Sequence, residues 1–331
     1  MQIIIYRMER NDCPTMNKYS TFIGYSTDSR IRYAATSGGV SSAIIIYLLD
    51  NGIAKSGLSF TYSKTGLKYE PKLIYKSDDY NISASIYHEI PLFSWIKNHV
   101  AEIQSPFVFT ALPCQVKPIK TFLEKHNIKS YAIQLICSSQ QTFEATEYLL
   151  KRLKISKSEV DRIRYRGAGW PSGISVYLKN GKTVKVGNTG SIWTDIFHSK
   201  LFCMPRCFYC NPDMPVYADI MCADPWRIDK AETEKRGRTL FHVNEEFFRS
   251  VFVNMREEKM IVLQKCEESL FYYSQEGVIR QKRKNLKHKK IVRMQKNIYA
   301  SSLYRTIVLS SAVTFNIHLF LKKVFEKIFV R

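Results

Sequence analysis

The sequence predicts an α/β fold, a mixed sheet flanked by helices, with a cysteine-rich segment and a basic helical C-terminal tail. Two apolar, strand-like runs, 107–111 (FVFTA) and 131–137 (YAIQLIC), are each followed by a helical pattern. Such alternation of strands and helices is typical of α/β proteins. From residue 278 onward the composition changes to a basic sequence that is poor in acids, which indicates a separate tail.

The remaining elements follow from periodicity and turn signals along the chain. In the first third we expect a strand, a helix that Asn51-Gly52 stops, a hairpin and a second helix, at 22–26, 37–50, 53–75 and 91–103. In the rest we expect short strands at 158–186, a helix at 189–198, a strand at 218–226, and strands at 239–243 and 260–265 around a helix at 244–256.

Small residues, Ser37-Gly38-Gly39, open the first long helix just before Val40. Small residues at a helix start let a ligand approach the free backbone N–H groups, and the helix dipole favours a phosphate there. The same tripeptide also serves as a plain loop and N-cap. The sequence leaves both interpretations open.

Two cysteines follow successive predicted strands. Cys114 lies at a strand-to-helix turn, and Cys137 ends the next strand. The carboxyl ends of strands are where sites form in open α/β sheets, and a helix N-terminus lowers the pKa of a thiol. Cys114 is therefore a candidate ligand or nucleophile. Both residues could equally be small buried thiols.

The cysteine-rich segment, 201–228, contains Cys203, Cys207, Cys210 and Cys222. Cys207 and Cys210 form a Cys-x-x-Cys pair, whose spacing lets two thiolates bind one metal centre. Residues 1–13 contain no secretory signal, so we expect a cytoplasmic protein whose thiols stay reduced. The eight cysteines are then better explained as ligands or buried thiols than as disulfides.

The net charge of +21 fits either an anionic partner or a solvated basic surface, and the sequence leaves both open. The basic run 280–296 precedes an uncharged apolar stretch, 307–321, which is short for a membrane span. Attachment to an anionic membrane surface and docking on the domain or a partner both fit this pattern. Nucleic-acid binding ranks last, because no recognisable module is present. Arg162, Arg164 and Arg166 alternate and could meet an anion or form a solvated edge.

With the motifs SGGV, ALPCQ, LIC, RYRGAGW and the run from Cys207 to Trp226 in this order, the chain resembles the beta subunit family of coenzyme F420 hydrogenase and dehydrogenase. The resemblance extends from about residue 19 to about residue 275. It implies a flavin-site region at 19–104 and a region with cluster cysteines at 105–277, followed by the tail at 278–331.

The resemblance also implies FAD and iron–sulfur clusters as cofactors. Ser37, Gly38 and Gly39 match the segment that lies against the flavin, with Val40, Gln115 and Arg166 as further candidate cofactor-binding residues. Cys114, Cys137, Cys207 and Cys210 match cluster cysteines, and four thiolates suffice for one [4Fe–4S] cluster. Asp224 and Arg166 are candidates for proton transfer only because they lie in matched motifs. Such residues are more often structural, so no catalytic residue is assigned.

Some positions depart from the family pattern. The upstream ferredoxin-like cysteine motif of many members is absent, and Leu112 stands where a Thr is usual. Cys203 and Cys222 are additional thiols near the predicted ligands, and either could replace one of them.

The function that the resemblance implies is electron transfer between a ferredoxin-like donor, or a redox partner subunit, and an organic acceptor. Some family members belong to cell-surface polysaccharide biosynthesis. The competing interpretation is a non-catalytic partner protein of a membrane-associated assembly, stabilised by zinc or by a cluster. From the tail we also expect that the protein attaches peripherally to the inner face of the membrane.

Overall fold

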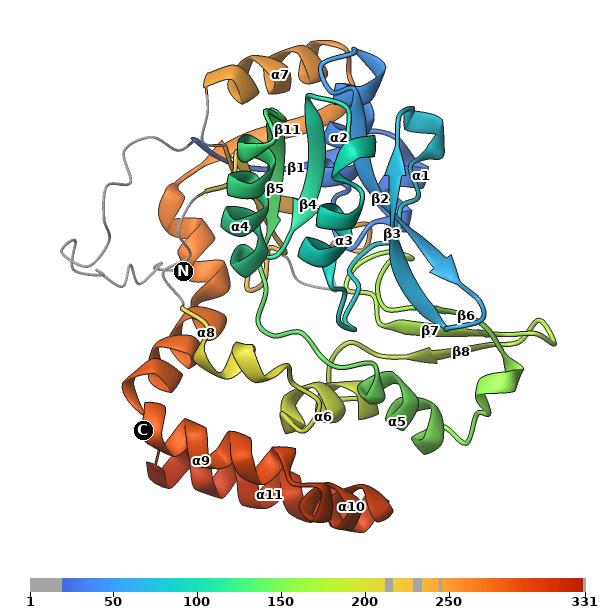
Figure 1. The fold of residues 1–331 in the computed structure, drawn as a ribbon, viewed down its shortest axis with the longest axis vertical. Coiled ribbons are helices and arrows are strands. Elements are labelled where there is room, and N and C mark those ends of the chain that lie inside the picture. The colour runs from blue at the N-terminus through green and yellow to red at the C-terminus, as the bar shows by residue number, and fades with distance from the viewer. Residues whose placement is uncertain (1–19, 212–216, 229–233, 244–245, 330–331) are drawn as a thin grey trace.

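The computed structural model describes residues 20–211, 217–228, 234–243 and 246–329 (Figure 1). Eight strands form one mixed sheet in the order β11-β1-β10-β9-β5-β4-β2-β3, in which β2, β4, β5 and β9 run parallel and the remaining pairs are antiparallel. Its strands are β1 (Ser20–Ser26), β2 (Ser56–Ser63), β3 (Lys68–Ile74), β4 (Phe107–Ala111), β5 (Ser130–Leu135), β9 (Ile220–Ala223), β10 (Thr239–Val243) and β11 (Ile261–Cys266). The predicted α/β fold is confirmed.

Helices cover both faces of this sheet. Helices α2 (Val40–Asp50) and α7 (Glu246–Glu257) share one apolar core with it. Helices α3 (Leu92–Asn98), α4 (Pro113–Lys125) and the first turns of α8 (Glu268–Lys287) share the other. Because both faces are buried, the central strands are continuous apolar runs in the sequence. The short helix α1 (Ser29–Ala34) follows β1.

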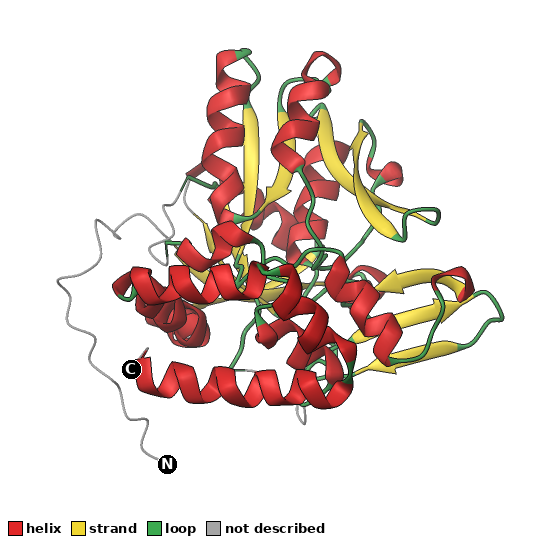
Figure 2. Cartoon of the chain, turned by 60° about the horizontal axis from the view of Figure 1, so that its bottom comes forward, coloured by secondary structure: helices red, strands yellow, loops and turns green. Residues whose placement is uncertain are grey.

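A second body with its own core lies beside the large sheet (Figure 2). It contains a three-stranded antiparallel sheet of β6 (Val160–Arg164), β7 (Ile174–Leu178) and β8 (Thr183–Val186). Helices α5 (Glu144–Arg152) and α6 (Ile192–Ser199) pack with it, together with the tail helices α9 (Lys289–Ala300), α10 (Ser302–Ser310) and α11 (Ala312–Phe329).

Several predicted elements match and others differ in detail. The hairpin of β2 and β3 and the strands β4 and β5 occur as expected. Strand β5 ends at Leu135, and residues 136–143 form a loop that pairs with segment 202–204 before α5 begins. Helix α8 runs through residue 278, and the large sheet takes strands from both sides of residue 105. The predicted division into regions stays a prediction.

No single helix in the described part of the chain has the length and apolar composition needed to cross a membrane. Helices α10 and α11 meet that criterion only as a pair, with a bend of 117° between them.

Candidate functional site

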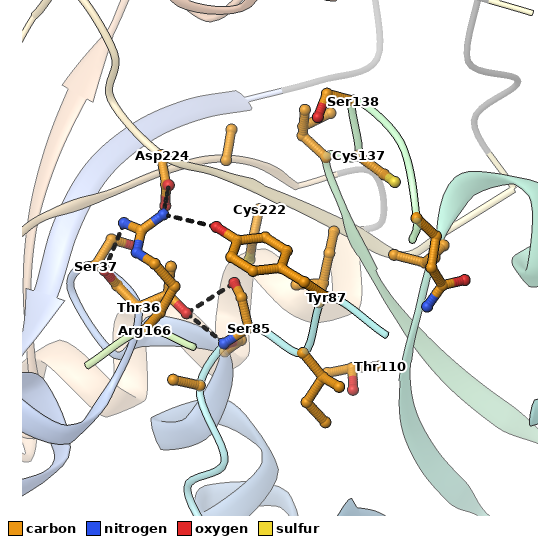
Figure 3. A pocket seen from close by; sticks show the side chains of 18 of the residues that line it. Thr36, Ser37, Ser85, Tyr87, Thr110, Cys137, Ser138, Arg166, Cys222 and Asp224 are labelled. Carbon is orange, nitrogen blue, oxygen red and sulfur yellow. Dashed lines mark hydrogen bonds and ion pairs between the residues drawn. The ribbon is translucent and has the colours of Figure 1, made fainter. Parts of the chain in front are cut away.

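A cavity of about 490 Å³ lies where the two bodies meet, beyond the carboxyl ends of β4 and β5 and beside the start of α2. Ser37, Gly39, Gln115, Cys137 and Arg166, all candidates from the sequence, line it. Figure 3 shows that Cys137 lies on one side of the cavity and that Arg166 and Asp224 lie on the other. The carboxyl edge of a parallel sheet is the usual place for a ligand in α/β folds.

The small residues before α2 differ in whether they line the cavity or pack against the large sheet. Ser37 and Gly39 line the cavity, and Gly39 is the N-cap with a φ of 77°. Gly38 instead packs against the large sheet, because its N–H donates to Thr239 Oγ1 at 3.0 Å and a Cβ there would lie 2.5 Å from the Gly24 carbonyl oxygen. Val40 is fully buried in the sheet core. Among the residues lining the cavity, the first turn of α2 contributes Ser41 and Ser42.

Gln115 has a local structural role at the cavity edge. Its Oε1 accepts a hydrogen bond from the Leu112 N–H at 3.0 Å, which caps the start of α4. Pro113 occupies the first position of that helix, where a missing N–H costs nothing. This cap fixes the turn that positions Cys114.

Arg166 and Asp224 form a buried ion pair at 3.2 Å. The guanidinium also donates to Tyr87 Oη, Ser172 Oγ and the Thr36 carbonyl oxygen. Burial raises the pKa of Asp224, and the Arg166 charge opposes that shift.

The three alternating arginines do not act together. Arg162 is exposed over the Tyr177 ring, and Arg164 donates to the carbonyl oxygens of Ala34 and Ile82. Of the three, only Arg166 lines the cavity.

The four predicted cluster cysteines come from three separate segments and are brought together. Cys114 is at the start of α4, Cys137 follows β5, and Cys207 and Cys210 lie in and just after the short helix Pro205–Tyr209. The charges of Cys114, Cys207 and Cys210 all act on Cys137, and those of Cys207 and Cys210 act on Cys114. Cys137 also lines the cavity, so it links the thiol group to the cavity.

The thiol pKa values differ with their surroundings. Burial raises the pKa of Cys137 to about 12, and it also raises the pKa of Cys114. The sequence argument expected the helix N-terminus to lower the pKa of Cys114, but partial desolvation of its thiol raises this pKa although the residue is exposed. The positive charges of Lys282 and Arg206 oppose these shifts for Cys137 and Cys114 respectively.

The other cysteines lie at varying distances from this group. The Cys203 thiol donates to the Met204 carbonyl oxygen at 3.8 Å, and its interaction with the neighbouring Cys207 thiol lowers the pKa of Cys207 and raises that of Cys203. Cys222 is buried in β9 and lines the cavity, and Cys266 lies in β11. All seven cysteines in the described residues are free thiols, while Cys13 lies outside the described residues.

Four thiolates could bind a zinc ion or an iron–sulfur cluster, and the two arrangements differ in their geometry. Within the described ranges, no three His, Cys, Asp or Glu side chains lie close enough together to hold one metal ion. A zinc ion bonded to four thiolates at about 2.3 Å would bring their sulfurs almost into contact. A [4Fe–4S] cluster takes four thiolates on four different irons and so holds them further apart.

Sequence reasoning missed two groups of residues at the site. The irregular segment 81–90 contributes Ser85 and Tyr87, and Tyr87 stacks on Trp193 with ring centroids 5.8 Å apart. Lys282, from α8, is buried and its Nζ donates to the Cys137 carbonyl oxygen at 2.6 Å. An irregular loop has no periodicity, and a lysine in a basic run has no distinguishing signal, so neither could have been found from sequence alone.

Two family models match the chain in sequence order. Residues 21–97 match the N-terminal model of the coenzyme F420 hydrogenase/dehydrogenase beta subunit, and residues 105–269 match its C-terminal model. The chain belongs to this family. The cavity and the thiol group both lie largely within the matched residues, and Lys282 lies beyond them.

Among solved structures, this beta-subunit family member is similar to a chain of the F420-reducing [NiFe] hydrogenase complex from Methanosarcina barkeri. The TM-score is 0.60 at 16% identity, over 84% of this chain and 93% of that one. At this identity the similarity supports the fold alone. Among curated proteins, none matches the sequence.

Proposed function

We propose that this family member is an FAD- and [4Fe–4S]-dependent redox protein that passes electrons between a ferredoxin-like donor, or a redox partner subunit, and an organic acceptor. One observation carries the proposal. Four thiols from three segments converge at one end of a cavity, and Cys137 belongs to both the thiol group and the cavity. Electron transfer between two cofactors requires such adjacency.

Cys114, Cys137, Cys207 and Cys210 would hold the cluster, because their chemistry and number fit its four irons. Four thiolates could also bind a single structural zinc ion, so zinc is the alternative that metal analysis must exclude. Lys282 and Arg206 place positive charge beside a group that becomes anionic when its thiols ionise. Cys203 would not bind the cluster itself but would favour the thiolate of the ligand Cys207, whose pKa it lowers.

The cavity would hold the flavin. The N-terminus of α2, with Gly39 and Ser41 at the cavity wall, offers backbone N–H groups and a positive dipole end that suit a phosphate. Tyr87, Trp193 and Phe197 give another part of the cavity wall an aromatic surface that would exclude water.

The bound cofactors would supply one-electron and two-electron chemistry, and the chain supplies binding, orientation and charge. Asp224 is the side chain best placed to hold a proton in the cavity, because burial raises its pKa while Arg166 fixes its orientation. No other residue is assigned a catalytic role.

The partner and setting follow from charge and redox state. Exposed Arg206 lies beside the thiol group and suits an acidic electron donor such as a ferredoxin. The free thiols support a reducing, cytoplasmic setting. A role in cell-surface polysaccharide biosynthesis stays a prediction from the resemblance, and the acceptor is unassigned.

Anaerobic purification tests this proposal. We expect iron and labile sulfide together with releasable FAD. Zinc in place of iron would contradict the cluster and favour a structural metal site. Iron without FAD, even after reconstitution with FAD, would contradict the flavin and favour a non-catalytic partner protein.

A further inference from the structure

Helix α11 carries an apolar stripe that faces away from the rest of the protein. Its residues recur at helical spacing and are between 37% and 66% exposed: Val313, Ile317, Phe320, Leu321, Val324 and Ile328. The opposite side of the same helix is buried, with Phe315 and His318 almost fully enclosed. The exposed surface of a soluble protein seldom carries so continuous an apolar strip, so the stripe marks an interaction surface.

Specific contacts hold the inner face of the tail against the second body. His318 contacts Tyr304 Oη at 2.8 Å and the Ser199 carbonyl oxygen at 3.0 Å. Lys151 donates to the Leu309 carbonyl oxygen at 3.0 Å. The tail is therefore a fixed layer along one side of the molecule, as the positions of α9, α10 and α11 show in Figure 1.

The surroundings of the stripe are strongly basic. After residue 277 the sequence has 14 Lys and Arg residues and a single acid, Glu326, which pairs with Lys322 at 2.9 Å. Lys284, Lys323 and Lys327 line a groove between α8 and α11 together with two stripe residues, Phe320 and Val324. Apolar side chains surrounded by lysines match the boundary between the acyl chains and the headgroups of an anionic bilayer.

We propose that the tail attaches this protein to the surface of an anionic membrane, with the α11 stripe inserted into the headgroup region and the surrounding lysines on the lipid phosphates. In a cytoplasmic protein this is the inner face of the membrane. The helix lies along the surface and does not cross it, because its other face is docked on the protein and α10 turns away from α11 by 117°. The proposal is independent of the redox function.

Flotation of the intact, cofactor-loaded protein with lipid vesicles tests this attachment. One set of vesicles contains phosphatidylcholine alone, and the other contains phosphatidylcholine and phosphatidylglycerol in equal amounts. We compare the wild type with an apolar variant, Ile317→Ser/Phe320→Ser, and a charge variant, Lys323→Glu/Lys327→Glu. Matched controls on the far helix α7 are Val253→Ser and Arg256→Glu, which change an exposed valine and an exposed arginine.

The wild type should float with the anionic vesicles, and high salt should reduce the bound fraction. The apolar and charge variants should each bind at least about tenfold more weakly, while both controls bind like the wild type. Unchanged iron content and circular dichroism would show that the variants are folded.

Four outcomes would overturn the proposal. The first is no binding to the anionic vesicles. The second is equal loss of binding in the tail variants and the controls. The third is binding that salt and alkaline extraction cannot reverse, which indicates a spanning helix. The fourth is self-association through the stripe without vesicle binding, which would show that the stripe binds a second copy of the chain and not a membrane.

Discussion

Single side chains decide the charge balance of the thiol group. Burial raises the pKa of Cys137 to about 12, so this thiol needs nearby positive charge in order to ionise. Lys282 supplies compensation from a distant part of the chain: its ammonium group donates to the Cys137 carbonyl oxygen, and its charge favours the thiolates of Cys137 and Cys207. We infer that Lys282 tunes the proposed cluster.

Replacing this lysine should shift the cluster's reduction potential. In Lys282→Met the protein should keep its iron, but the potential should fall by roughly 60 mV or more, because an electron is harder to add once a nearby positive charge is gone. Potentiometric titration measures the shift. Lys284→Met, on the same helix and partly exposed, is the control and should move the potential little. Equal shifts in both variants, or none, would contradict a specific role for Lys282.

At the scale of elements, the site depends on how helix and strand ends are joined. The capped start of α4 fixes Cys114, and the loop after β5 fixes Cys137 by pairing with segment 202–204. The loop before α2 packs closely on the sheet. At Gly38 a side chain would collide with the backbone of Gly24 and Thr239, which a small shift cannot relieve.

Two glycine substitutions separate packing from helix propensity. Gly38→Ala should lower the free energy of unfolding by about 2 kcal/mol or more, because the added Cβ would lie 2.5 Å from a carbonyl oxygen. Gly277→Ala, within α8 and with no neighbouring atom near the added Cβ, should instead raise it by up to about 1 kcal/mol. Urea denaturation measures both. A Gly38→Ala protein as stable as the wild type would mean that the loop does not pack as described.

At the scale of the whole molecule, part of the fold and of the candidate site could be predicted from the sequence. Apolar runs and helix periodicity predicted the α/β fold, and the rule that parallel strands deliver residues to one edge predicted that Cys114 and Cys137 would meet. The contributions of Lys282, Tyr87 and Cys203 depend on contacts between distant segments, which no local pattern encodes. The docking of the tail on the second body was one of several alternatives, because amphipathic helices look alike whether they cover protein or lipid.

Acid should destabilise the whole molecule through two buried histidines, His88 and His242. Burial lowers the pKa of each to about 4, and His88 is held neutral because its Nε2 accepts from the Tyr69 N–H. Below the ordinary pKa of about 6.5 the unfolded chain takes up protons that the folded protein cannot, so stability is lost between about pH 6.5 and 4. At about pH 5 each histidine should cost roughly 2 kcal/mol.

Urea midpoints across this pH range measure the loss. His242→Gln should have a shallower pH dependence than the wild type, whereas the exposed control His126→Gln should have the same slope. A midpoint that does not change between neutral pH and pH about 5 would contradict the neutral, buried state of both rings.

The central claim, that four thiols from three segments hold one [4Fe–4S] cluster, is tested most directly by iron and sulfide analysis with electron paramagnetic resonance of the dithionite-reduced protein. We expect about four irons and four sulfides per chain in the wild type, a reduced-cluster signal, and loss of both in Cys207→Ala and Cys137→Ala. Cys266→Ala, which removes a thiol in β11, should keep them. Full iron content and an unchanged signal in Cys207→Ala would contradict the claim.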